Sequence, residues 1–354
     1  MDDIVPSDRC ARLAADASSS LDWVTANLPR FAPDLDRLGT TLSTFGELAI
    51  LYAYAEASRG LLADHLPLER HLPAWRQLIM SQCQAQVYVE SAWRQLSIAH
   101  AIVLPYLMLR STGYRSSVYE RLLRRMQWWG YPAGSEAVPY RVLDREFFFW
   151  KAGYGRGEPN WYRRYRDTTV GKRCSPVYLD LESAYAVTHT LFYLTDFGGR
   201  RLALPTSDMK YIRSLVTALL VHYGRVGNWD ILGELLVVAP SVGGCNATVY
   251  EWAADAFARA RRADGAVPAN SSAATTLLEA SESTLDDLCF QHCYHTTLVA
   301  LLYYCGPPER ESDEASVQTG LAAGRRAGAT LAGTGRRRRA RRTTGLARAG
   351  SAAL

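Results

Sequence analysis

Two stretches of the chain combine an apolar helical pattern with side chains that can transfer protons. The first is residues 185–198, YAVTHTLFYLTDFG, in which Tyr185, His189 and Asp196 interrupt a largely apolar run. His189 follows Tyr185 by one helical turn and precedes Asp196 by two, so the three share one stripe of a helix. Such a stripe is typical of acid–base catalysis. The alternative is structural, with a histidine satisfied in the core and an aspartate bonding the chain near Gly198.

The second stretch is residues 289–298, CFQHCYHTTL. It holds two histidines three residues apart, the second being His295, and two cysteines four residues apart, the second being Cys293. With Asp287 just before them, these are side chains that bind zinc. The stretch lacks the paired C-x2-C pattern of strong zinc motifs, and helical cysteines also serve as small packing residues. We therefore predict a site without a metal, with zinc as the alternative.

The two stretches together favour proton transfer between two helices. We predict that His189 and His295 move protons and that Asp196 orients His189. Cys293 or Tyr185 is expected to assist as a proton donor or nucleophile. The sequence contains no dinucleotide-binding fingerprint, phosphate-binding loop or nucleophile elbow. No cofactor is therefore predicted.

Aromatic residues gather in two places, at 147–150 and at 161–165. Such clusters line cavities for apolar ligands, but they also fill large helical cores. Arg141, Asp144 and Arg145 stand just before the first cluster and are candidates for polar groups at the mouth of a cavity.

Helical periodicity dominates the chain, with apolar residues at i, i+3, i+4 and i+7 and turn signals between the periodic segments. Helices are predicted at about 8–28, 40–59, 71–98, 100–112, 115–130, 137–153, 180–198, 206–224, 228–240, 245–263 and 284–305. The stretches 153–177 and 271–283 are predicted to be a loop and a polar linker. Helices without a sheet to cover predict an all-α fold of antiparallel hairpins, arranged as an α/α toroid or a solenoid-like single domain.

The chain divides into a helical domain, residues 1–306, and a tail, residues 307–354. The tail is rich in Arg, Ala and Gly, has no aromatic residue, and is predicted to be disordered. Although the net charge is +5, the tail holds ten arginines against four acidic residues, which leaves 30 basic and 31 acidic residues in the domain. A nearly neutral domain argues against nucleic acid as a partner.

The compartment is predicted from the cysteines and the N-terminus. Seven cysteines without the dense spacing of a disulfide framework indicate a reducing environment. The first residues are acidic and no apolar segment follows them, unlike a signal peptide. No apolar run is long enough to span a bilayer. A cytoplasmic protein with no membrane contact is expected.

The segments YAVTHTLFYLTDFG (185–198) and CYHTTL (293–298) resemble an actinobacterial family known only as a domain of unknown function, whose members often sit among natural-product biosynthesis genes. The resemblance extends over most of the helical domain and excludes the tail. It implies an all-helical body and a small-molecule context, but no particular reaction.

These observations favour an enzyme of bacterial secondary metabolism that uses non-redox acid–base chemistry in an aromatic-lined cavity. Cyclisation, elimination or hydrolysis of a small-molecule or peptide-like substrate would fit. Two other classes stay open: a non-catalytic carrier for a biosynthetic intermediate, and a solenoid-type interaction scaffold. An enzyme predicts that the site residues converge on one cavity, whereas a scaffold predicts that they are scattered or sealed in the core.

Overall fold

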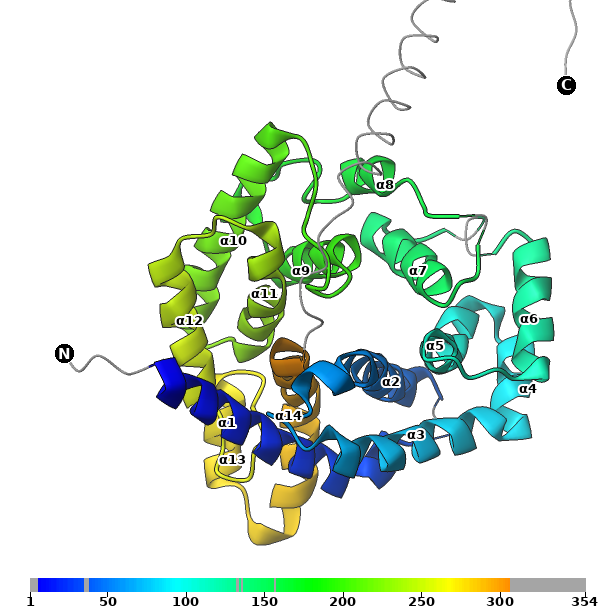
Figure 1. Ribbon diagram of the computed structural model, residues 1–354, viewed down its shortest axis with the longest axis horizontal. Coiled ribbons are helices and arrows are strands. Elements are labelled where there is room, and N and C mark those ends of the chain that lie inside the picture. Colours follow the sequence, from blue (N-terminus) through cyan, green and yellow to red (C-terminus); the bar gives the residue numbers. More distant parts are fainter. Residues whose placement is uncertain (1–5, 35–37, 132–133, 135, 156, 306–354) are drawn as a thin grey trace, which may run out of the picture. The chain divides into compact units, whose positions relative to one another are not determined.

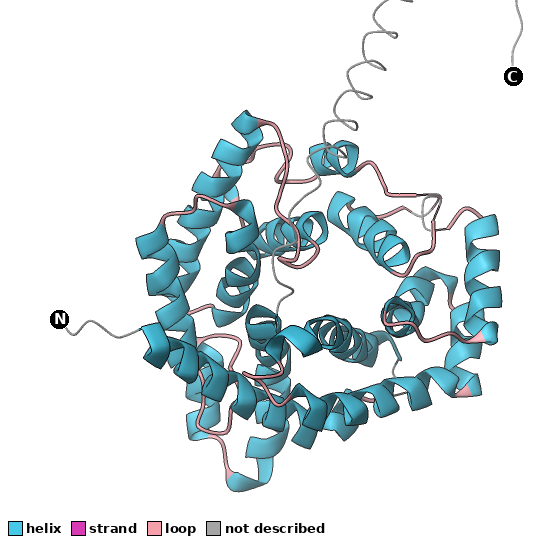
Figure 2. Ribbon diagram, in the orientation of Figure 1, coloured by secondary structure: helices cyan, strands magenta, loops and turns pink. Residues whose placement is uncertain are grey.

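Helices are the regular secondary structure of the part of the chain that the computed structural model describes, which is residues 6–34, 38–131, 134, 136–155 and 157–305 (Figure 2). Within these residues there are fourteen α-helices, three short 3-10 helices and no strand, and an isolated bridge pairs Asn228 with Asn270. The all-α prediction is confirmed. No described helix is both long and apolar enough to cross a membrane.

Six helices contact one another in a closed cycle (Figure 1). Each one packs against the next, and the last packs against the first. In order around the cycle they are α2 (Leu38–Leu62), α5 (Ala99–Ser111), α7 (Pro139–Lys151), α9 (Leu181–Thr195), α11 (Trp229–Val242) and α14 (Glu282–Cys305). We call these the ring helices.

The remaining helices lie outside the ring, and the chain alternates between outer and ring positions (Figure 1). The outer α-helices are α1 (Pro6–Ala26), α3 (Leu68–Gln84), α4 (Gln86–Arg94), α6 (Ser117–Trp128), α8 (Trp161–Asp167), α10 (Thr206–Val226), α12 (Ala247–Arg259) and α13 (Ser271–Glu279). The 3-10 helices are η1 (Leu28–Phe31), η2 (Leu96–Ile98) and η3 (Pro176–Tyr178). This alternation covers the outward faces of the ring helices.

Almost all side chains of α11 are apolar, because the surrounding helices bury nearly the whole surface of this helix. Gly233 lets it approach its neighbours closely: a Cβ added there would lie 2.7 Å from Cζ of Phe257 on α12 and 2.9 Å from Cγ1 of Val299 on α14. The missing side chain therefore sets the spacing between α11 and α14, the two helices that carry most of the polar site described below.

The helix predicted over 71–98 is wrong as a single element. The backbone at Ala85 is extended, with ψ 122°, so that α3 ends and α4 begins there. No Gly marks this break in the sequence, and the apolar periodicity continues across it.

Two segments predicted to be irregular contain short helices. Helix α8 lies in the predicted loop 153–177 and helix α13 in the predicted linker 271–283. Each begins with an asparagine cap: the side chain of Asn160 accepts from Arg163 N, and that of Asn270 accepts from Ala273 N. These caps accept hydrogen bonds from backbone N–H groups that the first helical turn leaves unpaired. The polar composition of the two segments did not reveal them.

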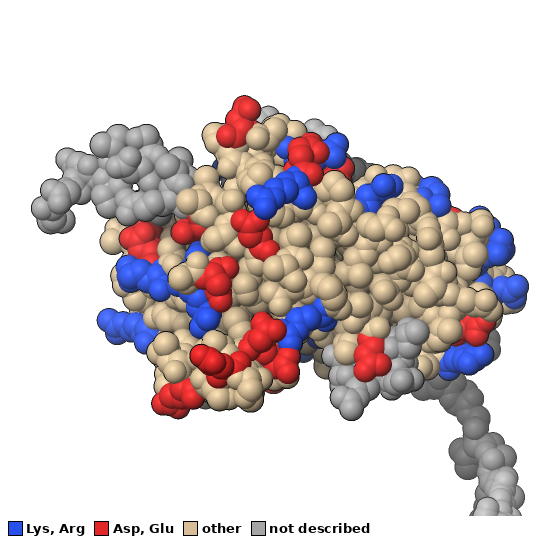
Figure 3. Space-filling view, turned by 90° about the horizontal axis from the view of Figure 1, so that it is seen from below, with Lys and Arg blue, Asp and Glu red and all other residues tan. Residues whose placement is uncertain are grey.

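The predicted tail, residues 307–354, lies outside the described residues. Within the described residues, acidic and basic side chains are interspersed on the face shown in Figure 3. This distribution agrees with the near-neutral charge of the helical domain.

A half-buried ionic network ties α5, α6 and the end of α7 together. Glu120 on α6 accepts from Nε of Arg110 at 2.8 Å and from the hydroxyl groups of Tyr106 at 2.7 Å and Tyr154 at 2.5 Å. Arg110 also donates to the carbonyl of Ala152, which caps α7. Although burial opposes it, these donors lower the pKa of Glu120 to about 2.

We expect Glu120→Gln to lower the free energy of unfolding at pH 7 by roughly 2–3 kcal/mol, because the three donors then face a neutral amide. The folded-state pKa lies below the unfolded value, so the carboxylate stabilises the fold above pH ~4.5 and loses this effect as the pH falls towards ~2. The difference in unfolding free energy between variant and wild type, measured by denaturant titration, should therefore disappear as the pH falls over that range. The exposed Glu90→Gln is the control, with an effect within about 0.5 kcal/mol. A difference in unfolding free energy that did not depend on pH would contradict this prediction.

Candidate active site

All six ring helices contribute side chains to one cavity of about 560 Å³. Most of its wall is apolar, formed by leucine, isoleucine, valine and phenylalanine side chains, including Phe148 and Phe149 from the first aromatic cluster. Its polar lining residues are Ser43 and Glu47 on α2, His100 on α5, Glu136 before α7, Arg141, Asp144 and Arg145 on α7, His189 and Tyr193 on α9, Glu234 on α11, and His295 on α14. The cavity thus has the size and composition of a small-molecule site.

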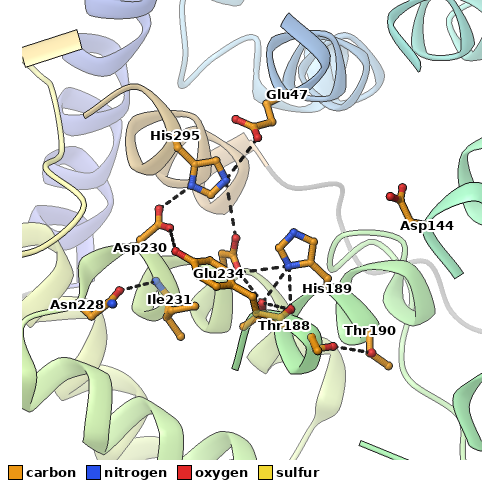
Figure 4. Close-up of polar contacts among 12 residues, drawn as sticks. Glu47, Asp144, Thr188, His189, Thr190, Asn228, Asp230, Ile231, Glu234 and His295 are labelled. Atoms are coloured by element: carbon orange, nitrogen blue, oxygen red, sulfur yellow. Dashed lines mark hydrogen bonds and ion pairs between the residues drawn. The ribbon is translucent and has the colours of Figure 1, made fainter. Parts of the chain in front are cut away.

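Asp230, near the start of α11, accepts hydrogen bonds from three residues on the polar side of the cavity (Figure 4). Its Oδ1 accepts from Nδ1 of His295 at 2.6 Å and from the Thr296 hydroxyl at 2.7 Å, and its Oδ2 accepts from the Tyr185 hydroxyl at 2.6 Å. The residue is 6% exposed. Burial alone would raise its pKa, but the charge of His295 and these three donors hold the pKa below its usual value. Asp230 therefore stays ionised and fixes the ring of His295.

The other nitrogen of His295, Nε2, faces two more carboxylates. It lies 3.8 Å from Oε1 of Glu234 and 4.0 Å from Oε1 of Glu47. Burial would lower the pKa of His295, but the charges of Asp230 and Glu47 raise it well above its ordinary value. Both distances are too long for hydrogen bonds. Among the described residues, therefore, Nε2 has no direct hydrogen-bonding partner.

Glu234 is sealed in the wall, with its side chain 1% exposed. The Thr188 hydroxyl donates to its Oε2, and Nδ1 of His189 lies 3.7 Å from the same oxygen. Burial, followed by the negative charge of Asp230, raises the pKa of this carboxyl group. In the described part of the chain no donor lies within hydrogen-bond distance of Oε1, the oxygen nearer His295.

His189 presents one nitrogen to its own helix and the other to the cavity side (Figure 4). Its Nδ1 donates to the backbone carbonyl of Tyr185 at 2.9 Å. The Nδ1–H tautomer leaves the lone pair on Nε2. Burial and the charge of Arg141 lower the pKa of His189 to about 3, so the ring is neutral.

Basic side chains from α7 and α5 form another part of the cavity wall: Arg141, Arg145 and His100. Nε and Nη1 of Arg145 are buried without a hydrogen-bonding partner among the described residues, and so is Nδ1 of His100. Arg141 pairs with Asp144 at 3.3 Å, and burial raises the pKa of Asp144 to about 6. A guanidinium with two unpartnered nitrogens in a cavity wall is a site for an anion.

Three of the five predicted site residues belong to this arrangement. His189 and His295 both line the cavity. Tyr185 joins them through its hydroxyl, which bonds Asp230, and through its carbonyl, which bonds His189. The two stretches singled out in the sequence therefore do meet in space, across α9 and α14.

Asp196 does not orient His189. Helix α9 ends at Thr195, and Asp196 takes the left-handed C-cap conformation with φ 51°. Its carboxylate accepts from Nζ of Lys151 at 2.6 Å and from the hydroxyl of Tyr54 at 2.5 Å. The stripe predicted from i, i+7 spacing fails because the helix stops one residue too early, and a backbone carbonyl holds His189 instead.

Cys293 also lies away from the cavity. It is 0% exposed and does not line the cavity, and its thiol interacts with that of Cys289 one turn earlier. Asp287, the other ligand of the zinc alternative, pairs with Arg30 and has a side chain that is 72% exposed. In the described residues the group that brings metal-binding atoms within 4.8 Å of one another is instead Asp230, Glu234 and His295.

The sequence analysis missed the acidic residues of the site. Asp230 and Glu234 are four residues apart on α11, whose other side chains are almost all apolar. Two acids at i, i+4 in an apolar helix that carries no basic residue are a signal of a buried polar site. Glu47 gave a weaker signal, because a single acidic residue within a long helix is also common on exposed helix faces.

Residues 17–305 match the model of a protein family described as Domain of unknown function (DUF6895). Because the match covers most of the chain, the protein belongs to this family. The match confirms a domain of unknown function over most of the helical domain, which is one part of the resemblance noted in the sequence. No curated protein and no solved structure matches the chain.

We expect Thr188→Val to lower the free energy of unfolding by about 1–3 kcal/mol, because it removes the hydroxyl donor of the buried Glu234. The matched control is Thr190→Val on the same helix. Thr190 is equally buried, but its hydroxyl bonds only the carbonyl of Ala186 within α9, so a smaller loss is expected. Denaturant unfolding of both variants measures the difference, and equal losses would show that the bond to Glu234 contributes nothing.

Proposed function

We propose that this member of the DUF6895 family is an enzyme that moves protons on a small substrate held in the ring cavity, without redox chemistry. Cyclisation, elimination and hydrolysis all fall within this class. The observation that carries the proposal is the convergence of His189, His295, Glu47 and Glu234 from four ring helices on one cavity.

A purely structural role accounts poorly for this arrangement. Buried carboxylates and imidazoles are costly unless each is fully hydrogen-bonded. Here Nε2 of His295 and Oε1 of Glu234 are turned towards each other at 3.8 Å without bonding. Such poised groups are characteristic of sites that complete their bonds with a ligand.

The same cavity supports a substrate class. Its wall is mostly apolar, and two guanidinium nitrogens of Arg145, Nε and Nη1, have no hydrogen-bonding partner among the described residues. We infer a substrate with an apolar body and an acidic group, such as a carboxylate, which Arg145 would bind and so present the rest of the molecule to the histidines. A place in actinobacterial secondary metabolism and a cytoplasmic location belong to this proposal, supported by the sequence alone.

The enzymatic function can be tested by incubating the purified protein with metabolite extracts of actinobacterial cultures and following them by mass spectrometry. We expect a time-dependent conversion that leaves the mass unchanged or adds or removes water. Glu234→Gln and His189→Gln should reduce its rate at least ~100-fold, the usual size of a general acid–base contribution. His292→Gln, on α14 but outside the cavity lining, should retain it.

Conversion at equal rates by all these variants would overturn the proposed site. If no compound were converted but one metabolite co-purified with the protein, the carrier function would be the better explanation.

The substrate class is tested with phenylalkanoic acids and their methyl esters as probes in calorimetric titrations. We expect the acids to bind and the esters to bind at least ~10-fold more weakly, because only the carboxylate can pair with Arg145. Arg145→Gln should remove the difference between acid and ester, while Arg225→Gln, on the exposed surface of α10, should preserve it. Equal binding of acids and esters by the wild type would contradict an acidic substrate.

A further inference from the structure

We propose that Glu234 and His295 hold a divalent transition-metal cation at the wall of the cavity, with Asp230 fixing His295 from behind and Glu47 as the nearest further carboxyl group. His189, which lines the same cavity, then remains as the acid–base group of the proposed function. This proposal concerns the same cavity as the proposed function but is tested separately from it.

The spacing of the three ligand atoms is the first argument. Nε2 of His295 lies 3.8 Å from Oε1 of Glu234 and 4.0 Å from Oε1 of Glu47. Both distances exceed a hydrogen bond. Two ligands that are each ~2.1 Å from a common ion lie roughly 3.0–3.8 Å apart, depending on the angle between them. Glu234 and His295 therefore lie at the spacing of two ligands of one ion, whereas Glu47 has to move towards Glu234 to join them.

The orientation of the histidines is the second argument. A histidine that binds a metal usually donates its other ring N–H to a carboxylate or a backbone carbonyl, which fixes the tautomer. His295 has such a partner in Asp230 at 2.6 Å, and His189 has one in the carbonyl of Tyr185 at 2.9 Å. In both residues Nδ1 is occupied and Nε2 is left for the cavity.

Asp230 itself is placed as a supporting group rather than as a ligand. Its two oxygens accept three hydrogen bonds, from His295, Thr296 and Tyr185. A carboxylate bonded in this way raises the basicity of the imidazole that it holds.

Unused carboxylate oxygens are the third argument. Glu234 has a side chain that is 1% exposed, yet its Oε1 receives no hydrogen bond from the described residues. Oε2 of Glu47 is also buried without a partner. Three carboxyl groups therefore surround one imidazole, and two of them keep an oxygen without a hydrogen-bonding partner among the described residues. A divalent cation would use these oxygens.

The ligand set defines the class of ion. Imidazole nitrogen and carboxylate oxygen without thiolate suit zinc, cobalt, manganese or ferrous iron, whereas a calcium site would consist of oxygen alone. When bound, such an ion polarises a substrate oxygen or lowers the pKa of a bound water molecule. Within the chain, His295 and Glu234 would hold the ion, and Arg145 would orient an anionic substrate in the same cavity.

Titration of the metal-free full-length protein with Co²⁺, followed by calorimetry and visible absorption, tests the proposal. We expect one ion per chain and the absorption of a nitrogen- and oxygen-ligated ion, without the thiolate charge-transfer band that the buried cysteines would produce. His295→Gln and Glu234→Gln should weaken binding at least ~100-fold, and Asp230→Asn by ~10–100-fold, the typical loss when a supporting group is removed. His292→Gln, three residues before His295 on the same helix, should bind as the wild type does.

The remaining outcomes either overturn the cation site or separate it from the proposed enzymatic function. No saturable binding by the wild type, or equal binding by all variants, would overturn the cation site. Because folding is followed by circular dichroism, loss of binding through unfolding of a variant is recognised; Glu47→Gln, on a different helix, then provides a second test, in which binding should also weaken. Binding of the ion without any metabolite conversion would leave the cation site standing and reject the proposed enzymatic function. Conversion of a metabolite by a protein that binds no ion would reject the cation site and leave the proposed enzymatic function standing.

Discussion

The carboxylate of Asp230 joins three ring helices at one buried point. It belongs to α11, and it accepts hydrogen bonds from Tyr185 on α9 and from His295 and Thr296 on α14. A buried charge of this kind is tolerable only while every donor stays in place. The geometry of His295 follows from this constraint: its ring is fixed in its plane, and its Nε2 is directed at Glu234.

Tight packing and polar bonding support each other around this point. Gly233 lets α11 approach α14 closely, and the next residue along the chain, Glu234, reaches His295 across that narrow gap. Asp230 and Glu234 are almost fully buried between these helices, so the mutual effects of the charges are large. The cavity is therefore polar at the junction of α9, α11 and α14 and at the basic group of α7, with an apolar surface elsewhere.

The fold class could be predicted from the sequence because helical periodicity runs through almost every segment. Two local features broke the pattern: the extended backbone at Ala85, and the asparagine caps that start α8 and α13 in polar segments. Part of the site was also predictable, because His189 and His295 stand out in apolar helices. The partner of His189 was not, since it is a backbone carbonyl, and spacing placed Asp196 on a helix that ends before it. The pairing of α11 with α14 depends on ring closure, which no local pattern records.

The closed cycle of helices has a consequence for how the protein is made. During synthesis α2 leaves the ribosome early, whereas α14, which closes the ring by packing against both α2 and α11, is the last described helix to appear. Until then Glu47 and Asp230 have no imidazole beside them, and the flanks of α2 and α11 that α14 will cover are open to water. Long-range closure of this kind is slow compared with local helix formation. A nascent chain therefore holds exposed apolar surface and an unfinished site until α14 docks, which makes it a natural client for chaperones that bind such surfaces.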